Sequence, residues 1–89
     1  MENPLQLCSD LKSIFRRQAG CWLDCDTLHR VRGLCVAVEQ AAQDEHCLAE
    51  IGRVARYAER LHSHCDPRTD LLREQILLAL DSIQDRLYT

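Results

Sequence analysis

The sequence predicts an all-α fold, a compact four-helix bundle-like domain with short connections. Apolar residues recur three and four positions apart in four segments, which is the spacing of one face of a helix. No segment alternates apolar and polar residues over the length of a strand, and β-branched residues are few. The dipeptides Asn3-Pro4 and Asp66-Pro67 each join an N-cap residue to a proline suited to the first helical position. A length of 89 residues allows one domain, residues 1–89.

The first predicted helix covers residues 4–18, and the second covers residues 27–43. Gly20 fits the left-handed position that follows a helix end, and Asp24 or Asp26 can cap the second helix. The apolar stripes are Leu7, Cys8, Leu11, Ile14 and Phe15 in the first helix, and Leu28, Val31, Leu34, Cys35, Val38, Ala41 and Ala42 in the second.

The third predicted helix covers residues 45–64 with Asp44 as its cap, and the fourth covers residues 67–88. Because the connections are short, consecutive helices are expected to be antiparallel neighbours. The apolar stripes are Cys47, Leu48, Ile51, Val54, Ala55, Ala58 and Leu61 in the third helix, and Leu72, Ile76, Ala79, Leu80, Ile83 and Leu87 in the fourth.

Composition and charge narrow the class of protein. Hydrophobic residues make up 46% of the chain and charged residues 28%, which is ordinary for a globular domain. The net charge of −3 argues against a nucleic-acid binder that relies on attraction to phosphate. No apolar run is long enough to cross a membrane, and the first residues lack the basic and apolar regions of a secretory signal. We therefore expect a cytoplasmic protein with no membrane association.

Six cysteines suggest a disulfide framework only in a secreted context, which is not predicted here. Four of them fall within or directly continue the apolar stripes and are expected to be reduced core thiols: Cys8, Cys35, Cys47 and Cys65. Cys21, Cys25 and His29 form a C-x3-C-x3-H pattern that is a weak candidate for zinc, or for a redox pair of the two thiols. The pattern lacks a fourth ligand and follows Gly20, so we expect no bound metal and no cofactor.

Histidines and acidic pairs give no catalytic constellation. The segment from His62 to Asp66 resembles a metal site in composition, but its position at a helix end favours imidazoles that complement the last carbonyls. His46, near a helix start, is expected to be solvated. No nucleophile elbow or metalloprotease helix is present, so the protein is not expected to be an enzyme.

The fourth helix has more apolar residues than one stripe can use. Leu71 and Leu78 lie on one side of the stripe and can still join a broad core face. Leu77 and Tyr88 project further from it and are expected to be exposed. All four are therefore candidate residues for binding a partner.

Arg53, Arg56 and Arg60 form a row on the third helix, where Glu50 and Glu59 stand at pairing distance. This row is a second candidate partner surface. The same row is the basis of one alternative function, a nucleic-acid-binding regulator. The other alternative is a zinc-stabilised or thiol-redox module that uses Cys21, Cys25 and His29.

The leading prediction is a small, non-catalytic regulatory protein, either an adaptor or an inhibitor, that binds another protein and forms a homodimer. Small acidic helical proteins of this kind include inhibitors encoded by phages and mobile elements. That comparison is a class expectation and does not depend on any particular residue.

Overall fold

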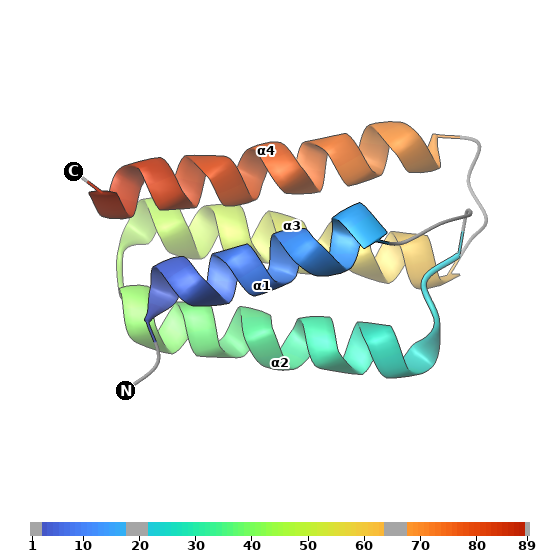
Figure 1. The fold of residues 1–89 in the computed structure, drawn as a ribbon, viewed down its shortest axis with the longest axis horizontal. Helices are drawn as coiled ribbons and strands as arrows, with labels where there is room; N and C mark the ends of the chain where they lie inside the picture. The colour runs from blue at the N-terminus through green and yellow to red at the C-terminus, as the bar shows by residue number, and fades with distance from the viewer. Residues whose placement is uncertain (1–2, 18–21, 64–67, 89) are drawn as a thin grey trace.

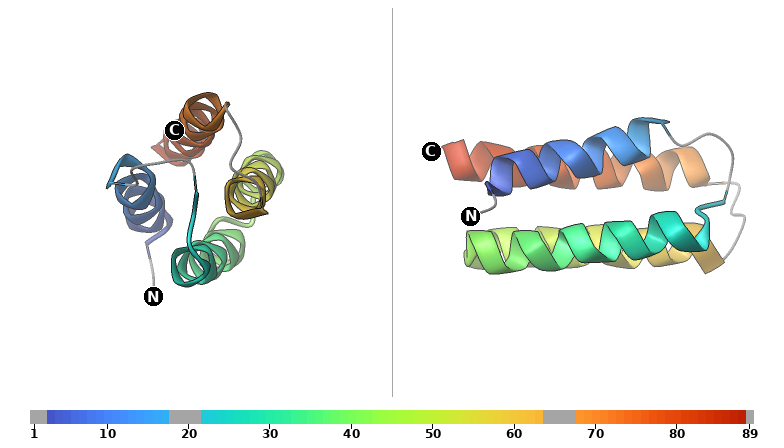
Figure 2. Two further views of the ribbon diagram at one scale, coloured as in Figure 1. Left: turned by 90° about the vertical axis from the view of Figure 1, so that its right-hand side faces the viewer. Right: turned by 60° about the horizontal axis from the view of Figure 1, so that its bottom comes forward.

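Four helices form an antiparallel bundle in the computed structural model, which describes residues 3–17, 22–63 and 68–88 and contains no strand among them (Figure 1). The helices are α1 (Pro4–Arg17), α2 (Cys25–Ala42), α3 (Glu45–Ser63) and α4 (Thr69–Tyr88). Each helix packs against its neighbours in sequence, and α1 packs against α4 to close the ring. Figure 2 shows this ring end-on, and both chain ends lie at the same end of the bundle. The predicted all-α fold is confirmed.

The observed helix bounds lie within two residues of the predicted ranges. The second helix begins at Cys25 instead of Thr27 because Asp24 is its N-cap, with extended backbone and a carbonyl that accepts from the Leu28 N–H at 2.9 Å. It ends one residue early because Gln43 adopts the left-handed conformation, with φ of 44°. Gly20, His64, Asp66 and Pro67, expected near the other helix ends, lie outside the described residues.

Polar caps fix two helix starts as the sequence predicts. The Asn3 side-chain oxygen accepts from the Leu5 N–H at 2.9 Å. An Asp44 carboxylate oxygen accepts from the Cys47 N–H at 3.2 Å, and it also lies 3.4 Å from Arg86 Nε. The hydrogen bond from Cys47, together with the positive charge of Arg86, lowers the pKa of the Asp44 carboxyl. The Asp44 cap therefore also ties the start of α3 to the end of α4.

The core runs along the bundle axis and takes side chains from all four helices. Phe15, Leu11, Ile51, Ile76 and Ile83 are fully buried within it. Three of the four predicted core thiols, Cys8, Cys35 and Cys47, are buried, which confirms their predicted place in the core; Cys65 lies outside the described residues. The stripe residues Ala41 and Leu48 are exposed, so the buried faces of α2 and α3 are narrower than predicted.

The short connector that precedes α2 closes one end of the bundle. The Leu23 side chain is buried, and its N–H donates to the Leu61 carbonyl oxygen at 3.1 Å. The Trp22 indole Nε1–H donates to the His62 carbonyl oxygen at 2.7 Å. Because the last carbonyls of a helix have no partner inside it, the connector supplies the donors that the end of α3 lacks.

Candidate functional site

Leu71 and Leu78 lie on the side of α4 that faces α3, and both are exposed, at 50% and 54%. At 100° per residue they lie within roughly 40° of Ser82 around the helix. The Ser82 Oγ is 2.9 Å from His46 Nε2 on α3, which marks this side of α4 as the α3 side. Neither leucine joins the core, although their positions in the sequence were compatible with a broad core face that included them. They form instead an apolar strip beside α3.

Leu77 and Tyr88 lie on the opposite side of α4, which faces α1. Gln84 marks this side, because its Nε2 lies 3.2 Å from both the Leu5 carbonyl oxygen and the Ser9 Oγ of α1. Tyr88 is 80% exposed, as expected.

The prediction that Leu77 is exposed is wrong, because Leu77 is partly buried and packs against the core. It lies about 110° from the centre of the α4 stripe, whereas Leu78 lies about 150° away. The neighbouring helix α1 covers the flank that carries Leu77, so the buried face of α4 extends further on that side.

The arginine row of α3 is exposed along its whole length, at Arg53, Arg56 and Arg60. Arg53 Nη1 lies 3.9 Å from Glu50, as the sequence spacing suggests. The expected pairing of Glu59 with Arg56 is wrong, because Glu59 reaches across to α2 and binds Arg32.

Helix register places the acidic residue Glu74 of α4 near the level of this row. His46 and Ser82 are level with each other, and the two helices are antiparallel. Glu74 lies eight residues before Ser82 on α4, and Val54 lies eight residues after His46 on α3. Glu74 is therefore level with Val54, the residue that follows Arg53. Glu74 is exposed and makes no hydrogen bond or ion pair with any residue that the structure describes. We call the exposed side of α3 and α4 that carries Arg53, Arg56, Arg60, Leu71, Leu78 and Glu74 the α3–α4 face.

The candidate metal site gains no support from the described residues. Cys25 and His29 are both exposed in the first two turns of α2, while Cys21 lies outside the described part of the chain. No three metal-ligating side chains come together within residues 3–17, 22–63 and 68–88. The buried thiols of Cys8 and Cys35 are also poor nucleophiles, because desolvation raises the pKa of Cys8 to about 11 and that of Cys35 to about 12.

His62 differs from its predicted role. Its Nδ1 lies 2.8 Å from the Leu23 carbonyl oxygen, so it bonds the connector and not the last carbonyls of its own helix. The Trp22 ring stacks on the His62 ring, with 5.7 Å between centroids and 27° between planes. His46, expected to be solvated, is exposed but contacts Ser82. Sequence reasoning missed Trp22 and Glu74, because the importance of each depends on a partner far away in the chain.

Comparison with protein-family models, with curated proteins and with solved structures finds no match for this chain. Among the described residues, no helix combines the length and the apolar character needed to cross a membrane.

Proposed function

We propose that the protein is a small, non-catalytic regulatory protein of the cytoplasm, an adaptor or an inhibitor, and that it binds a second copy of itself through the α3–α4 face. The observation that carries this proposal is the pair of leucines, Leu71 and Leu78, exposed beside a row of arginines. Burial of one leucine side chain contributes about 1.5–3 kcal/mol, part of which is forgone while each is half exposed. The free thiols Cys8, Cys35 and Cys47 suit a reducing compartment.

A second copy is the occupant that best matches the charges of this face. Arginines lie on α3, whereas the exposed acidic residue Glu74 lies on α4 at nearly the same level. We consider a two-fold axis that runs parallel to the helices and between the two copies. This axis places α3 of each copy against α4 of the other, and every residue keeps its position along the helix axis. Arg53 then meets Glu74 of the other copy, and symmetry repeats the pair. Stacking α4 on α4 would instead bring acidic residues together.

The size of the face is compatible with a stable dimer. The 20 residues of α4 make a helix about 30 Å long, and adjacent helices are about 10 Å apart. Two such helices side by side present roughly 600 Å² in projection, which approaches the ~800 Å² per partner of a standard interface. The exposed leucines lie seven residues apart and therefore extend along two turns of this face.

Sedimentation equilibrium on three proteins tests the proposal. The wild type is expected to dimerise, and the double variant Leu71→Lys/Leu78→Lys to dimerise at least about tenfold more weakly, because lysines would replace the apolar strip and face the arginine row of the other copy. Val36→Lys is the matched control, since Val36 is 50% exposed but lies on α2. Circular dichroism checks that all three remain helical. A wild type that stays monomeric at high concentration, or a Val36→Lys defect equal to that of the double variant, contradicts the proposal.

A further inference from the structure

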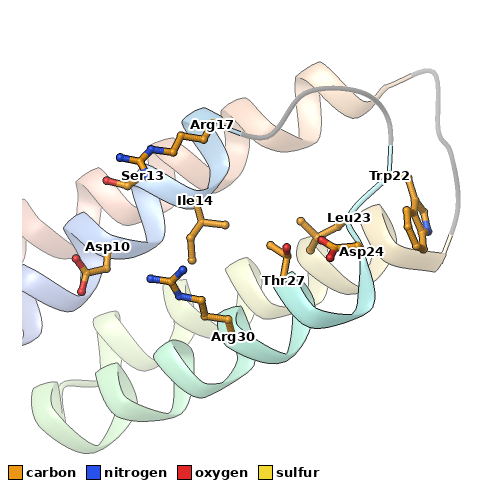
Figure 3. Close-up of a pocket in the computed structure, with 9 residues that line it drawn as sticks. All are labelled: Asp10, Ser13, Ile14, Arg17, Trp22, Leu23, Asp24, Thr27 and Arg30. Carbon is orange, nitrogen blue, oxygen red and sulfur yellow. The ribbon is translucent and has the colours of Figure 1, made fainter.

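A groove of ≈ 540 Å³ lies between α1 and α2 on the side of the bundle away from the α3–α4 face. Ile14 and Leu23 provide an apolar base for it, and Trp22 lies at its end (Figure 3). The remaining lining residues are polar or charged: Asp10, Ser13 and Arg17 from α1, and Asp24, Thr27 and Arg30 from the start of α2. Each wall therefore contributes one guanidinium, one hydroxyl group and one carboxylate.

The two arginines have no partner in the described structure, although carboxylates line the same groove. Neither Arg17 nor Arg30 forms an ion pair or hydrogen bond with any residue in 3–17, 22–63 or 68–88. Asp10 instead accepts from Gln6 Nε2 at 3.0 Å, within α1. In Figure 3, Arg30 extends from α2 toward α1, while Arg17 lies along α1 beside Ser13. Arg17 and Arg30 thus line the groove from opposite walls, and Arg30 extends into the space between the two helices.

The start of α2 adds hydrogen-bond donors to the groove. Asp24, its N-cap residue, makes no side-chain hydrogen bond to the first turn, so that turn keeps unsatisfied N–H groups. Thr27, in the same turn, lines the groove. Guanidinium groups, hydroxyl groups and free N–H groups are all donors to oxyanions.

We propose that this groove binds a phosphate group, held between Arg17 and Arg30 with the hydroxyls of Ser13 and Thr27 as additional donors. A tetrahedral dianion presents oxygen atoms to both walls at once, whereas a single carboxylate presents its two oxygens in one plane. Arginine binds such groups through paired N–H donors. The apolar base formed by Ile14 and Leu23 suits an organic phosphate with a non-polar body.

Titration with inorganic phosphate at constant ionic strength, followed by amide chemical shifts, tests this site. The expected shifts are largest at Ser13, Arg17, Thr27 and Arg30. Arg17→Gln and Arg30→Gln should each weaken phosphate binding about tenfold, because each removes a charge-assisted hydrogen bond. Arg16→Gln is the matched control, since Arg16 is an exposed arginine in the last turn of α1 that does not line the groove and has no ion pair to a described residue. It should leave binding unchanged.

Three results would overturn the proposal. The first is the absence of shifts at these four positions, and the second is an equal loss of binding in Arg16→Gln. The third is succinate that binds as tightly as phosphate, which would make the groove a carboxylate site. Both groove arginines are exposed, so their variants are expected to fold, and circular dichroism verifies this.

Discussion

Trp22 and His62 form a reciprocal contact between residues 40 positions apart. The Trp22 indole donates to the His62 carbonyl oxygen at 2.7 Å, while the His62 ring stacks on the indole and bonds the adjacent Leu23 carbonyl. The connector before α2 is thereby attached to the last turn of α3. The contact also positions Leu23, which is buried in the core and lines the α1–α2 groove.

Substitution His62→Ala should lower the free energy of unfolding by about 1–3 kcal/mol, because it removes one hydrogen bond and the ring stack. Trp22 is the only tryptophan, so its fluorescence reports the contact directly. The expected signal is a red shift in the native state, as the ring becomes more hydrated. His29→Ala, at an exposed position of α2, is the control and should change neither quantity. An unchanged emission spectrum in His62→Ala would show that the stack is not formed in solution.

Neighbouring residues Leu77 and Leu78 should respond differently to truncation. Leu77 packs against the core, so Leu77→Ala is expected to cost about 1–2 kcal/mol of stability. Leu78 is 54% exposed, so Leu78→Ala should change monomer stability by less than about 0.5 kcal/mol. Urea unfolding at low protein concentration, where association is minimal, measures both. Equal losses would contradict the placement of the two side chains.

These neighbours also show where sequence analysis stops being sufficient. Periodicity identifies the centre of the α4 stripe, with Ile76 and Ile83 fully buried as predicted. Periodicity gives the angular position of a residue beside the stripe, but it does not show whether a neighbouring helix covers that side of α4. Leu77, about 110° from the stripe centre, is covered by α1, whereas Leu78, about 150° away on the α3 side, is not covered by α3.

Local chemistry was more predictable than long-range pairing. Asp44 caps α3 through an N–H three residues away, a contact that the sequence alone indicates. Glu59 instead binds Arg32, 27 residues away, and such a pair depends on how α2 and α3 pack. The candidate site shows the same contrast. The sequence alone indicates Leu71 and the arginine row as candidate residues. The position of Glu74 relative to that row depends on the register between α3 and α4, which only the structure gives.

Alkaline pH should destabilise the fold through its buried thiols. Burial raises the pKa of Cys35 to about 12 and that of Cys8 to about 11, whereas a thiol in the unfolded chain ionises near 9.0. Between those values the unfolded state releases protons that the folded state retains, so stability falls as pH rises above about 9. Each such thiol contributes a slope of up to about 1.4 kcal/mol per pH unit. The free energy of unfolding, measured with urea between pH 8 and about 11, should therefore fall less steeply for Cys35→Ala than for the wild type. Parallel curves for the two proteins would contradict this prediction.

The pairing of Arg53 with Glu74 of a second copy is the central claim, and a charge exchange tests it most directly. In Arg53→Glu the two interface pairs become Glu–Glu, and in Glu74→Arg they become Arg–Arg. Each variant alone should therefore dimerise about tenfold more weakly than the wild type. An equimolar mixture restores two opposite-charge pairs, because Glu at position 53 of one variant meets Arg at position 74 of the other.

Sedimentation equilibrium of the two variants, separately and mixed, is the deciding measurement. The account predicts monomers for each variant at concentrations where the wild type is dimeric, and dimers for the mixture. A mixture that stays monomeric, or single variants that dimerise as tightly as the wild type, would contradict it.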